Sequence, residues 1–221
     1  MSKMTNILSL QDLKDVRARI FKGDAEAICY WKVLYGNYNA LEMIEKLKKL
    51  ANQGNALAQL NLGDVYSRGR EVEQDYKKAI YWYMKSAKQG NYNALGLLGG
   101  LYYHGFGVEQ DYKQALYWWK KSAEQGSALI QFNLGLVYEK GEGAEQDIDE
   151  AIKWFEKSAK QDNHNALNSL GNLYYKGKGV KQDYEKANEL YRKSAEIFGE
   201  LIKEQSKIKE IEKEINERIK R

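Results

Sequence analysis

The chain has 221 residues, of which 30% are charged, and Lys and Arg together outnumber Asp and Glu by 35 to 31. This excess of positive charge is too small to indicate the basic surface that nucleic-acid-binding proteins carry. Proline is absent, so the residue that most often interrupts helices is missing. The composition therefore predicts an almost entirely helical protein with no nucleic-acid partner.

Disulfide, metal and membrane chemistry find little support in the sequence. Cys29 is the single cysteine, so neither an intramolecular disulfide nor a zinc site of several thiolates can form. The amino-terminal segment contains charged residues such as Lys3, Asp12 and Lys14 and has no long apolar run, which predicts neither a secretory signal nor a membrane span. We expect a cytoplasmic protein with no cofactor, no metal and no membrane contact.

A block of 36 residues recurs along the chain. Leu-Gly recurs at residues 62–63, 98–99, 134–135 and 170–171, and Ser-Ala at residues 86–87, 122–123, 158–159 and 194–195. A fixed period of this size is typical of a solenoid, in which each unit buries one face against the next. Such stacks present an extended surface that usually binds other proteins.

Each block has the signals of two helices, here named A and B. After Asn91, apolar residues at helical spacing predict an A helix that ends at Gly105, and Asp111 then begins a B helix. The Asp111 carboxylate can accept hydrogen bonds from the free amides of the first turn. Glu150, three residues after Asp147, predicts the two-way arrangement of a capping box.

Small residues recur where the A and B helices of a unit would meet, and they predict a close approach of the two helices, with Tyr and Trp filling the space between layers. These residues are Gly63, Gly99, Gly135 and Gly171 on the A helices, and Ala79, Ala115, Ala151 and Ala187 on the B helices.

The repeated pattern Leu-Gly-x-x-Tyr-x-x-Gly-x-Gly-Val-x-Gln-Asp-Tyr-x-x-Ala, followed by Trp-Tyr or Trp-Trp and then Ser-Ala-x-Gln-Gly, closely resembles the Sel1-like repeat family. The resemblance covers about residues 54–196 in four units. It implies an all-α fold, namely a right-handed α/α superhelical solenoid of helix-turn-helix repeats related to tetratricopeptide repeats. It also implies a protein-protein interaction adaptor, often part of bacterial signalling, virulence or quality-control complexes.

The two ends depart from the repeat. Residues 1–53 predict a capping helix at 10–21 followed by a degenerate repeat at 23–53. After the four repeats of 54–196, Ile197-Phe198 replaces the Gln-Gly that ends earlier B helices, so the last helix should run on through 197–221. Its narrow stripe of isoleucines fits a cap folded onto the last unit, a self-association helix or a frayed tail.

Positions that vary between units along the A helices are the candidate binding surface, because each unit must solve the same packing problem with its constant positions. In the family that the chain resembles, the A helices line the concave side of the solenoid. The middle of this surface is apolar and its border is basic, as protein recognition generally requires; alternatively, several of these side chains pack between units. The candidate partner-binding residues are Asn61, Asp64, Arg68, Leu97, Gly100, Tyr103, His104, Phe132, Asn133, Leu136, Lys140, Asn168, Asn172 and Tyr175.

Catalytic motifs are weak. His104 and His164 are the two histidines of the chain, and they do not occupy equivalent positions in their units, so neither a metal pair nor a Ser-His-acid arrangement is indicated. We predict a non-enzymatic adaptor that binds another protein of unknown identity. An immunity or antitoxin-like inhibitor of an effector is the alternative. The resemblance also raises a β-lactam-binding or hydrolysing enzyme, although the cysteine pairs of those family members are missing here.

Overall fold

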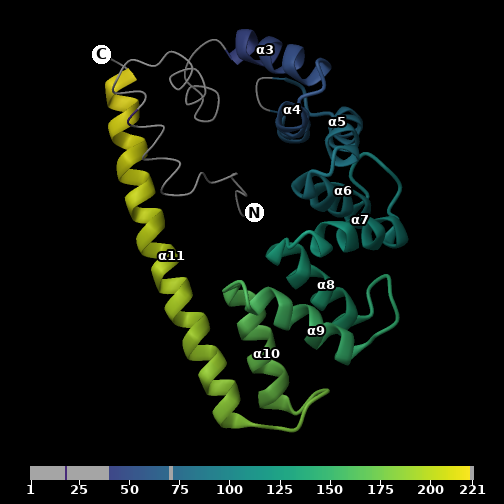
Figure 1. Ribbon diagram of the computed structural model, residues 1–221, viewed down its shortest axis with the longest axis vertical. Helices are drawn as coiled ribbons and strands as arrows, with labels where there is room; N and C mark the ends of the chain where they lie inside the picture. Colours follow the sequence, from purple (N-terminus) through teal and green to yellow (C-terminus); the bar gives the residue numbers. More distant parts are fainter. Residues whose placement is uncertain (1–17, 19–39, 70–71, 220–221) are drawn as a thin grey trace. The chain divides into compact units, whose positions relative to one another are not determined.

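A computed structural model describes residues 18, 40–69 and 72–219, and in that part of the chain the regular elements are α-helices (Figure 1). The predicted all-α stack of helix-turn-helix units is confirmed. The helices are α3 (Ala40–Asn52), α4 (Ala56–Arg68), α5 (Tyr76–Lys88), α6 (Tyr92–His104), α7 (Tyr112–Glu124), α8 (Ala128–Lys140), α9 (Ile148–Ala159), α10 (His164–Lys176) and α11 (Tyr184–Ile219).

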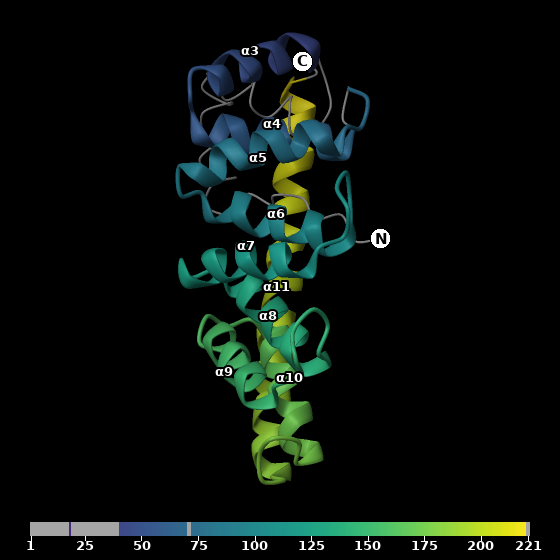
Figure 2. The same ribbon diagram turned by 90° about the vertical axis from the view of Figure 1, so that its right-hand side faces the viewer.

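The A helices are α4, α6, α8 and α10, and the B helices are α5, α7, α9 and the first part of α11. The first three A helices each pack against the B helix that follows, and α5, α7 and α9 each pack against the next A helix. Figure 2 shows α4 to α10 following one another along the stack in chain order. Each unit therefore contacts its neighbours in the sequence, as expected for a solenoid.

By contact density the chain divides into two units, Ile44–Ile197 and a second that combines residues 1–43 with 198–221. The four repeats lie within Ile44–Ile197, together with most of α3. The predicted capping helix at 10–21 lies outside the described residues except for residue 18, and so does the first half of the degenerate repeat at 23–53. The predicted boundaries at 53/54 and 196/197 stay a prediction.

The last B helix runs on, as predicted. Helix α11 is continuous over 36 residues, from Tyr184 to Ile219. Beyond the last repeat, Ile208 and Ile215 are buried, whereas Phe198 and Leu201 are about half exposed. Self-association through this helix stays a prediction.

The hairpin turns follow the predicted capping chemistry with one correction. The aspartates before the B helices accept hydrogen bonds from first-turn amides, as expected. The capping box predicted at α9 is wrong, because the Asp147 amide donates elsewhere and not to the Glu150 carboxylate. The Asp147 amide already donates to the Tyr138 carbonyl at 3.0 Å, and the Glu150 carboxylate pairs with Lys153 at 3.1 Å. The turn itself uses the donor that a capping box would need.

The serine of each Ser-Ala pair joins the two helices of its unit. Its hydroxyl lies in the B helix and donates to a carbonyl at the start of the A helix, thirty residues earlier, at 2.6–2.8 Å. These serines are buried, so an unbonded hydroxyl there would be costly. The bonds are Ser86 to Ala56, Ser122 to Tyr92, Ser158 to Ala128 and Ser194 to His164.

The close approach predicted at the Leu-Gly positions is confirmed. A Cβ atom on Gly99 would lie 2.2 Å from Cδ1 of Trp119, far inside van der Waals contact. The aromatic residue at the same B-helix position would meet a Cβ at 2.4–2.6 Å in the other units. Glycine is therefore required there by the neighbouring ring and not by backbone conformation. The pairs are Gly63–Tyr83, Gly99–Trp119, Gly135–Phe155 and Gly171–Tyr191.

Two adjacent glycines of α6 test this contact. Gly99→Ala should lower the free energy of unfolding by about 1–3 kcal/mol, because the new methyl group overpacks the buried Trp119 ring. Gly100→Ala is the matched control: nothing lies within 4 Å of a Cβ there, so the higher helix propensity of Ala should stabilise the protein by about 0.5–1 kcal/mol. Urea unfolding of both variants measures the difference, and equal effects would contradict the packing scheme.

Candidate functional site

One side of each A helix remains at least partly accessible, and we call these residues the A-face. They are spaced four, three and four residues apart, which places them on one side of a helix. The A-face consists of Leu57, Asn61, Asp64 and Arg68 on α4; Asn93, Leu97, Gly100 and His104 on α6; Leu129, Asn133, Leu136 and Lys140 on α8; and Asn165, Ser169, Asn172 and Lys176 on α10.

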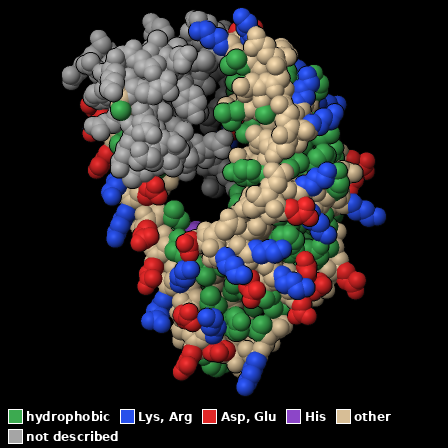
Figure 3. Space-filling view, viewed as in Figure 1, with side chains coloured by type: hydrophobic (Ala, Val, Ile, Leu, Met, Phe, Trp, Pro, Cys, Tyr) green, Lys and Arg blue, Asp and Glu red, His purple; other side chains and the backbone are tan. Residues whose placement is uncertain are grey.

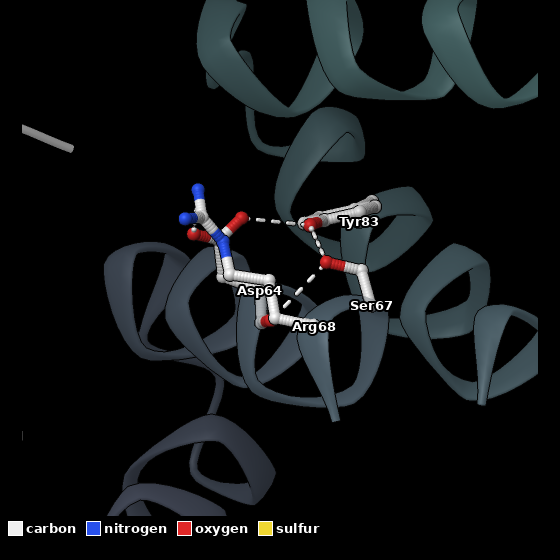
Figure 4. A network of polar contacts seen from close by, with 4 residues as sticks. All are labelled: Asp64, Ser67, Arg68 and Tyr83. Atoms are coloured by element: carbon white, nitrogen blue, oxygen red, sulfur yellow. Dashed lines mark hydrogen bonds and ion pairs between the residues drawn. The ribbon is translucent and has the colours of Figure 1, made fainter. Parts of the chain in front are cut away.

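Most of the predicted site residues lie on the A-face, but many of them have partners within the repeats. Asp64 accepts a hydrogen bond from the Tyr83 hydroxyl at 2.8 Å and pairs with Arg68 at 3.2 Å (Figure 4). Ser67 also contacts the Tyr83 hydroxyl, at 3.2 Å. Burial raises the pKa of Tyr83, so its hydroxyl keeps the proton that it donates. Asp64 thus supports the hairpin between α4 and α5.

Asp64 belongs to an A-face row that also contains Gly100, Leu136 and Asn172. The residue type in this row changes with the aromatic residue that faces it from the B helix. Tyr191 occupies the position of Tyr83 in the last unit, and its hydroxyl donates to Asn172 at 2.8 Å. In the third unit the aromatic residue is Phe155, which has no hydroxyl, and Leu136 lies with it in one apolar cluster. Variation along this row therefore has a structural cause that is independent of any partner.

A second predicted row consists of Leu60, Gly96, Phe132 and Asn168, and most of it packs inside the stack. Leu60 is buried. The Gly96 carbonyl accepts from the indole N–H of Trp119 at 3.0 Å, and the Phe132 ring lies 5.8 Å from that of Phe155. Asn168, in the last repeat, is exposed. Three of the four units thus use this row for packing.

A third row consists of Ser67, Tyr103, Glu139 and Tyr175. Its middle two members contact the neighbouring repeat. The Tyr103 hydroxyl donates to the Glu142 carboxylate in the next hairpin loop, and burial together with Glu142 raises the pKa of Tyr103 to about 12. One unit later, Glu139 pairs with Lys178 at 3.7 Å. Tyr175 belongs to the last repeat and remains 53% exposed. In two of the four units this row therefore connects the end of an A helix to the hairpin loop of the next unit.

The predicted basic border consists of Arg68, His104, Lys140 and Lys176 at the ends of the A helices. Several of these side chains have partners within the repeats. Arg68 pairs with Asp64 on its own helix, and Lys140 lies 3.8 Å from Glu142. The His104 ring lies 5.4 Å from that of Phe106 in a stacked arrangement. Figure 3 shows acidic and basic side chains interspersed over the repeats, with no single sign of charge dominating the visible face. Two cationic side chains of this border are therefore paired within the repeats.

Two A-face rows remain without such internal contacts to explain them, and we call them the leucine–asparagine rows. Leu57, Leu97 and Leu129 are 61%, 37% and 44% exposed, although most other leucines of these helices are buried. Leucine and asparagine alternate from unit to unit in the first row, and the second row alternates in the opposite phase over three units but has Ser169 in the last. The rows consist of Leu57, Asn93, Leu129 and Asn165, and of Asn61, Leu97, Asn133 and Ser169.

Sequence analysis missed Leu57 and Leu129, although a signal for them is present. The segments 57–61 and 129–133 share the pattern Leu-x-Gln-x-Asn, whereas 93–95 and 165–167 both read Asn-Ala-Leu. The repeats therefore alternate with a period of two units. A search at 36 residues alone does not reveal this longer period.

Among the described residues, no group of three or more His, Cys, Asp or Glu side chains is placed to hold a metal ion. His104 ends α6 and His164 begins α10, two repeats further on. Within the described ranges, the helices are all too short or too polar to cross a membrane.

Comparison with known proteins agrees with this architecture. The model of the Sel1 repeat matches residues 56–91, 93–127, 129–163 and 164–196. The chain belongs to the Sel1 repeat family. Proteins of this family are in general protein-interaction scaffolds and are typically non-catalytic. No curated protein matches the chain.

Three bacterial crystal structures are similar to this Sel1 repeat protein. The Escherichia coli protein c5321, a protective antigen of uropathogenic strains, is 42% identical with a TM-score of 0.68. The match covers 72% of this chain and 33% of c5321, so this chain spans about a third of the length of that protein. A Sel1 repeat protein from Oxalobacter formigenes is 28% identical with a TM-score of 0.69, over 85% of this chain and 72% of that one. A putative Sel1 repeat protein from Klebsiella pneumoniae is 28% identical with a TM-score of 0.50, over 70% and 74%.

The pairing of Asp64 with Tyr83 can be tested by a double-mutant cycle. Tyr83→Phe and Asp64→Leu should each lower the free energy of unfolding by about 1–2 kcal/mol, because each removes the hydrogen bond between the Tyr83 hydroxyl and the Asp64 carboxylate. The double variant recreates the Phe155–Leu136 pair, so it should be less destabilised than the sum of the two by about 1 kcal/mol. Additive effects in urea unfolding would show that the row varies independently of the aromatic residue.

The bond between Tyr103 and Glu142 makes a pH-dependent contribution. Because the pKa of Tyr103 rises from 10.0 to about 12 in the folded protein, the contribution is fully present below pH 10 and is lost as the pH rises towards 12. A difference titration of tyrosinate absorbance between the wild type and Tyr103→Phe should have its midpoint near 12, and Glu142→Gln should move it towards 10. A midpoint near 10 in the wild type would contradict the bond.

Proposed function

We propose that this Sel1 repeat protein is an adaptor that binds an extended segment of another protein across the leucine–asparagine rows. The observation that carries the proposal is the exposure of Leu57, Leu97 and Leu129 on helices where most other leucines are buried. Exposed leucines on one face, flanked by polar side chains, resemble the apolar centre and polar surround of protein interfaces.

The asparagines favour an extended partner over a helical one. Each side-chain amide has both a donor and an acceptor, so it can pair with the N–H and C=O of a peptide backbone. An extended segment presents such groups at every residue, whereas a helix has already used its own. The Asn93 and Asn165 side chains are exposed and the Asn61 and Asn133 side chains are partly exposed, and they alternate with the leucines. Apolar side chains of the partner would lie on the leucines while its backbone meets the asparagines.

Two finer predictions belong to the same proposal. An immunity or antitoxin-like protein would use this face to cover an effector, and the cytoplasm is the compartment we propose for either role. A chain with a single cysteine needs no oxidising environment to fold.

Photo-crosslinking tests the proposal directly. A benzophenone amino acid at position 97 or position 129 should crosslink to one partner protein in cells, at residues of a single extended segment that mass spectrometry identifies. Adding the second change Leu57→Asp should reduce the crosslink at position 97 by about tenfold, because a carboxylate would have to be desolvated where an apolar side chain docks.

The control uses an exposed leucine outside the A-face. Leu50 lies on α3 and is 47% exposed, so Leu50→Asp should leave the crosslink at position 97 unchanged. Circular dichroism of each variant establishes that the helices are retained. Loss of the crosslink in the Leu50 variant as well, or crosslinks scattered over many unrelated proteins, would contradict the proposal.

A further inference from the structure

A groove lies on the opposite side of the repeats, between the B helices α5 and α7. Its volume is about 510 Å³, and the residues that line it include Leu95, Trp118, Tyr117, Lys88, Lys121 and Glu124. All of them belong to the second repeat or to the end of the first. Tyr117 is 48% exposed. The groove therefore combines an apolar floor with an aromatic and basic rim.

The charge on this side of the stack is concentrated at these two helices. Helix α5 carries four lysines and no acidic residue, and α7 carries three lysines and one glutamate. Helix α9, at the equivalent place in the next repeat, carries two lysines and three acidic residues. Because the repeats share one fold, this local excess is not required by packing. It favours an anionic partner at α5 and α7 in particular.

A lysine of the rim lies over an aromatic ring. Lys121 Nζ is 4.5 Å from the centre of the Tyr117 ring, and both residues line the groove. Such a cation–π contact holds the ammonium group in place at the surface. When a carboxylate binds this positioned ammonium group, less side-chain entropy is lost than with a free lysine.

We propose that this groove is a second interaction surface, which binds an acidic segment of a partner protein. Carboxylates of the segment pair with Lys88 and Lys121, and an apolar side chain of the segment enters the groove against Leu95 and Trp118. Glu124 repels a carboxylate at one end and so restricts where the acidic residues sit. The proposal is separate from the A-face, because none of the residues that line the groove belongs to the A-face.

Nucleic acid, the other common polyanion, fits this surface less well. Proteins that bind single strands use free aromatic faces on which bases stack. Here one face of the Tyr117 ring is already covered by Lys121. The indole N–H of Trp118 is buried without a hydrogen-bond partner, but so is that of Trp154 in the next repeat; it is therefore a feature of the repeat and takes no part in the proposal.

The test uses a fluorescein-labelled peptide of alternating Glu and Leu, about ten residues long so that it spans the groove. Fluorescence anisotropy should give a Kd of about 10–100 µM that weakens as NaCl is raised. The double variant Lys88→Glu and Lys121→Glu should weaken binding by at least about tenfold. The matched control is Lys157→Glu on α9, where Lys157 lies 4.0 Å over the Trp154 ring; it should change the affinity less than about twofold.

Several outcomes would overturn the proposal. One is equal binding of a peptide of alternating Lys and Leu, or no binding of the acidic peptide at about 1 mM. Tighter binding of an oligouridylate of similar length would assign the groove to nucleic acid instead. Salt-sensitive dimers of the protein alone, absent from the double variant, would assign it to a second copy of the chain. Leu97→Asp should not alter peptide binding, so failure here is distinguishable from failure of the adaptor proposal.

Discussion

The contact between a glycine of each A helix and an aromatic ring of the following B helix sets the geometry on which the rest of the stack depends. A Cβ would meet the ring at 2.2–2.6 Å in all four repeats, so the two helices are closer than ordinary side chains allow. At this separation the buried serine of the B helix reaches the first carbonyls of the A helix. Identical hairpins follow, and identical hairpins can stack without interruption.

The same contact explains why variation among the repeats is a poor guide to binding. Once the aromatic position differs between Tyr, Trp and Phe, the residue that faces it must differ too: Asp64 accepts from a tyrosine, whereas Leu136 packs with a phenylalanine. Variation that compensates for a neighbour and variation that serves a partner look alike in one sequence. The exposed fraction of the side chain separates them, because Leu97 is exposed and Leu136 is not.

The sequence predicts what depends on local chemistry and on the period. Helix ends, the small residues at the crossing and the extension of the last helix follow from glycine, aspartate and the loss of Gln-Gly, and the structure agrees. The capping box at Glu150 failed because the Asp147 amide is used by the turn, a contact between residues nine apart that the motif does not include. Partners such as Tyr103 and Glu142 lie 39 residues apart, and no local pattern indicates them. The binding role of the predicted A-face residues stays a prediction.

A two-repeat period shapes both sides of the stack. Gln59 and Gln131 each donate to a carbonyl at the end of the preceding helix, α3 and α7 respectively, at 3.0 and 2.9 Å. The second repeat has Leu95 at this position, which cannot make that bond and instead lines the groove between α5 and α7. On the A-face, leucine and asparagine alternate with the same period in the row that begins at Leu57. Under the two proposals above, a pair of adjacent repeats is therefore the smallest unit that presents either surface.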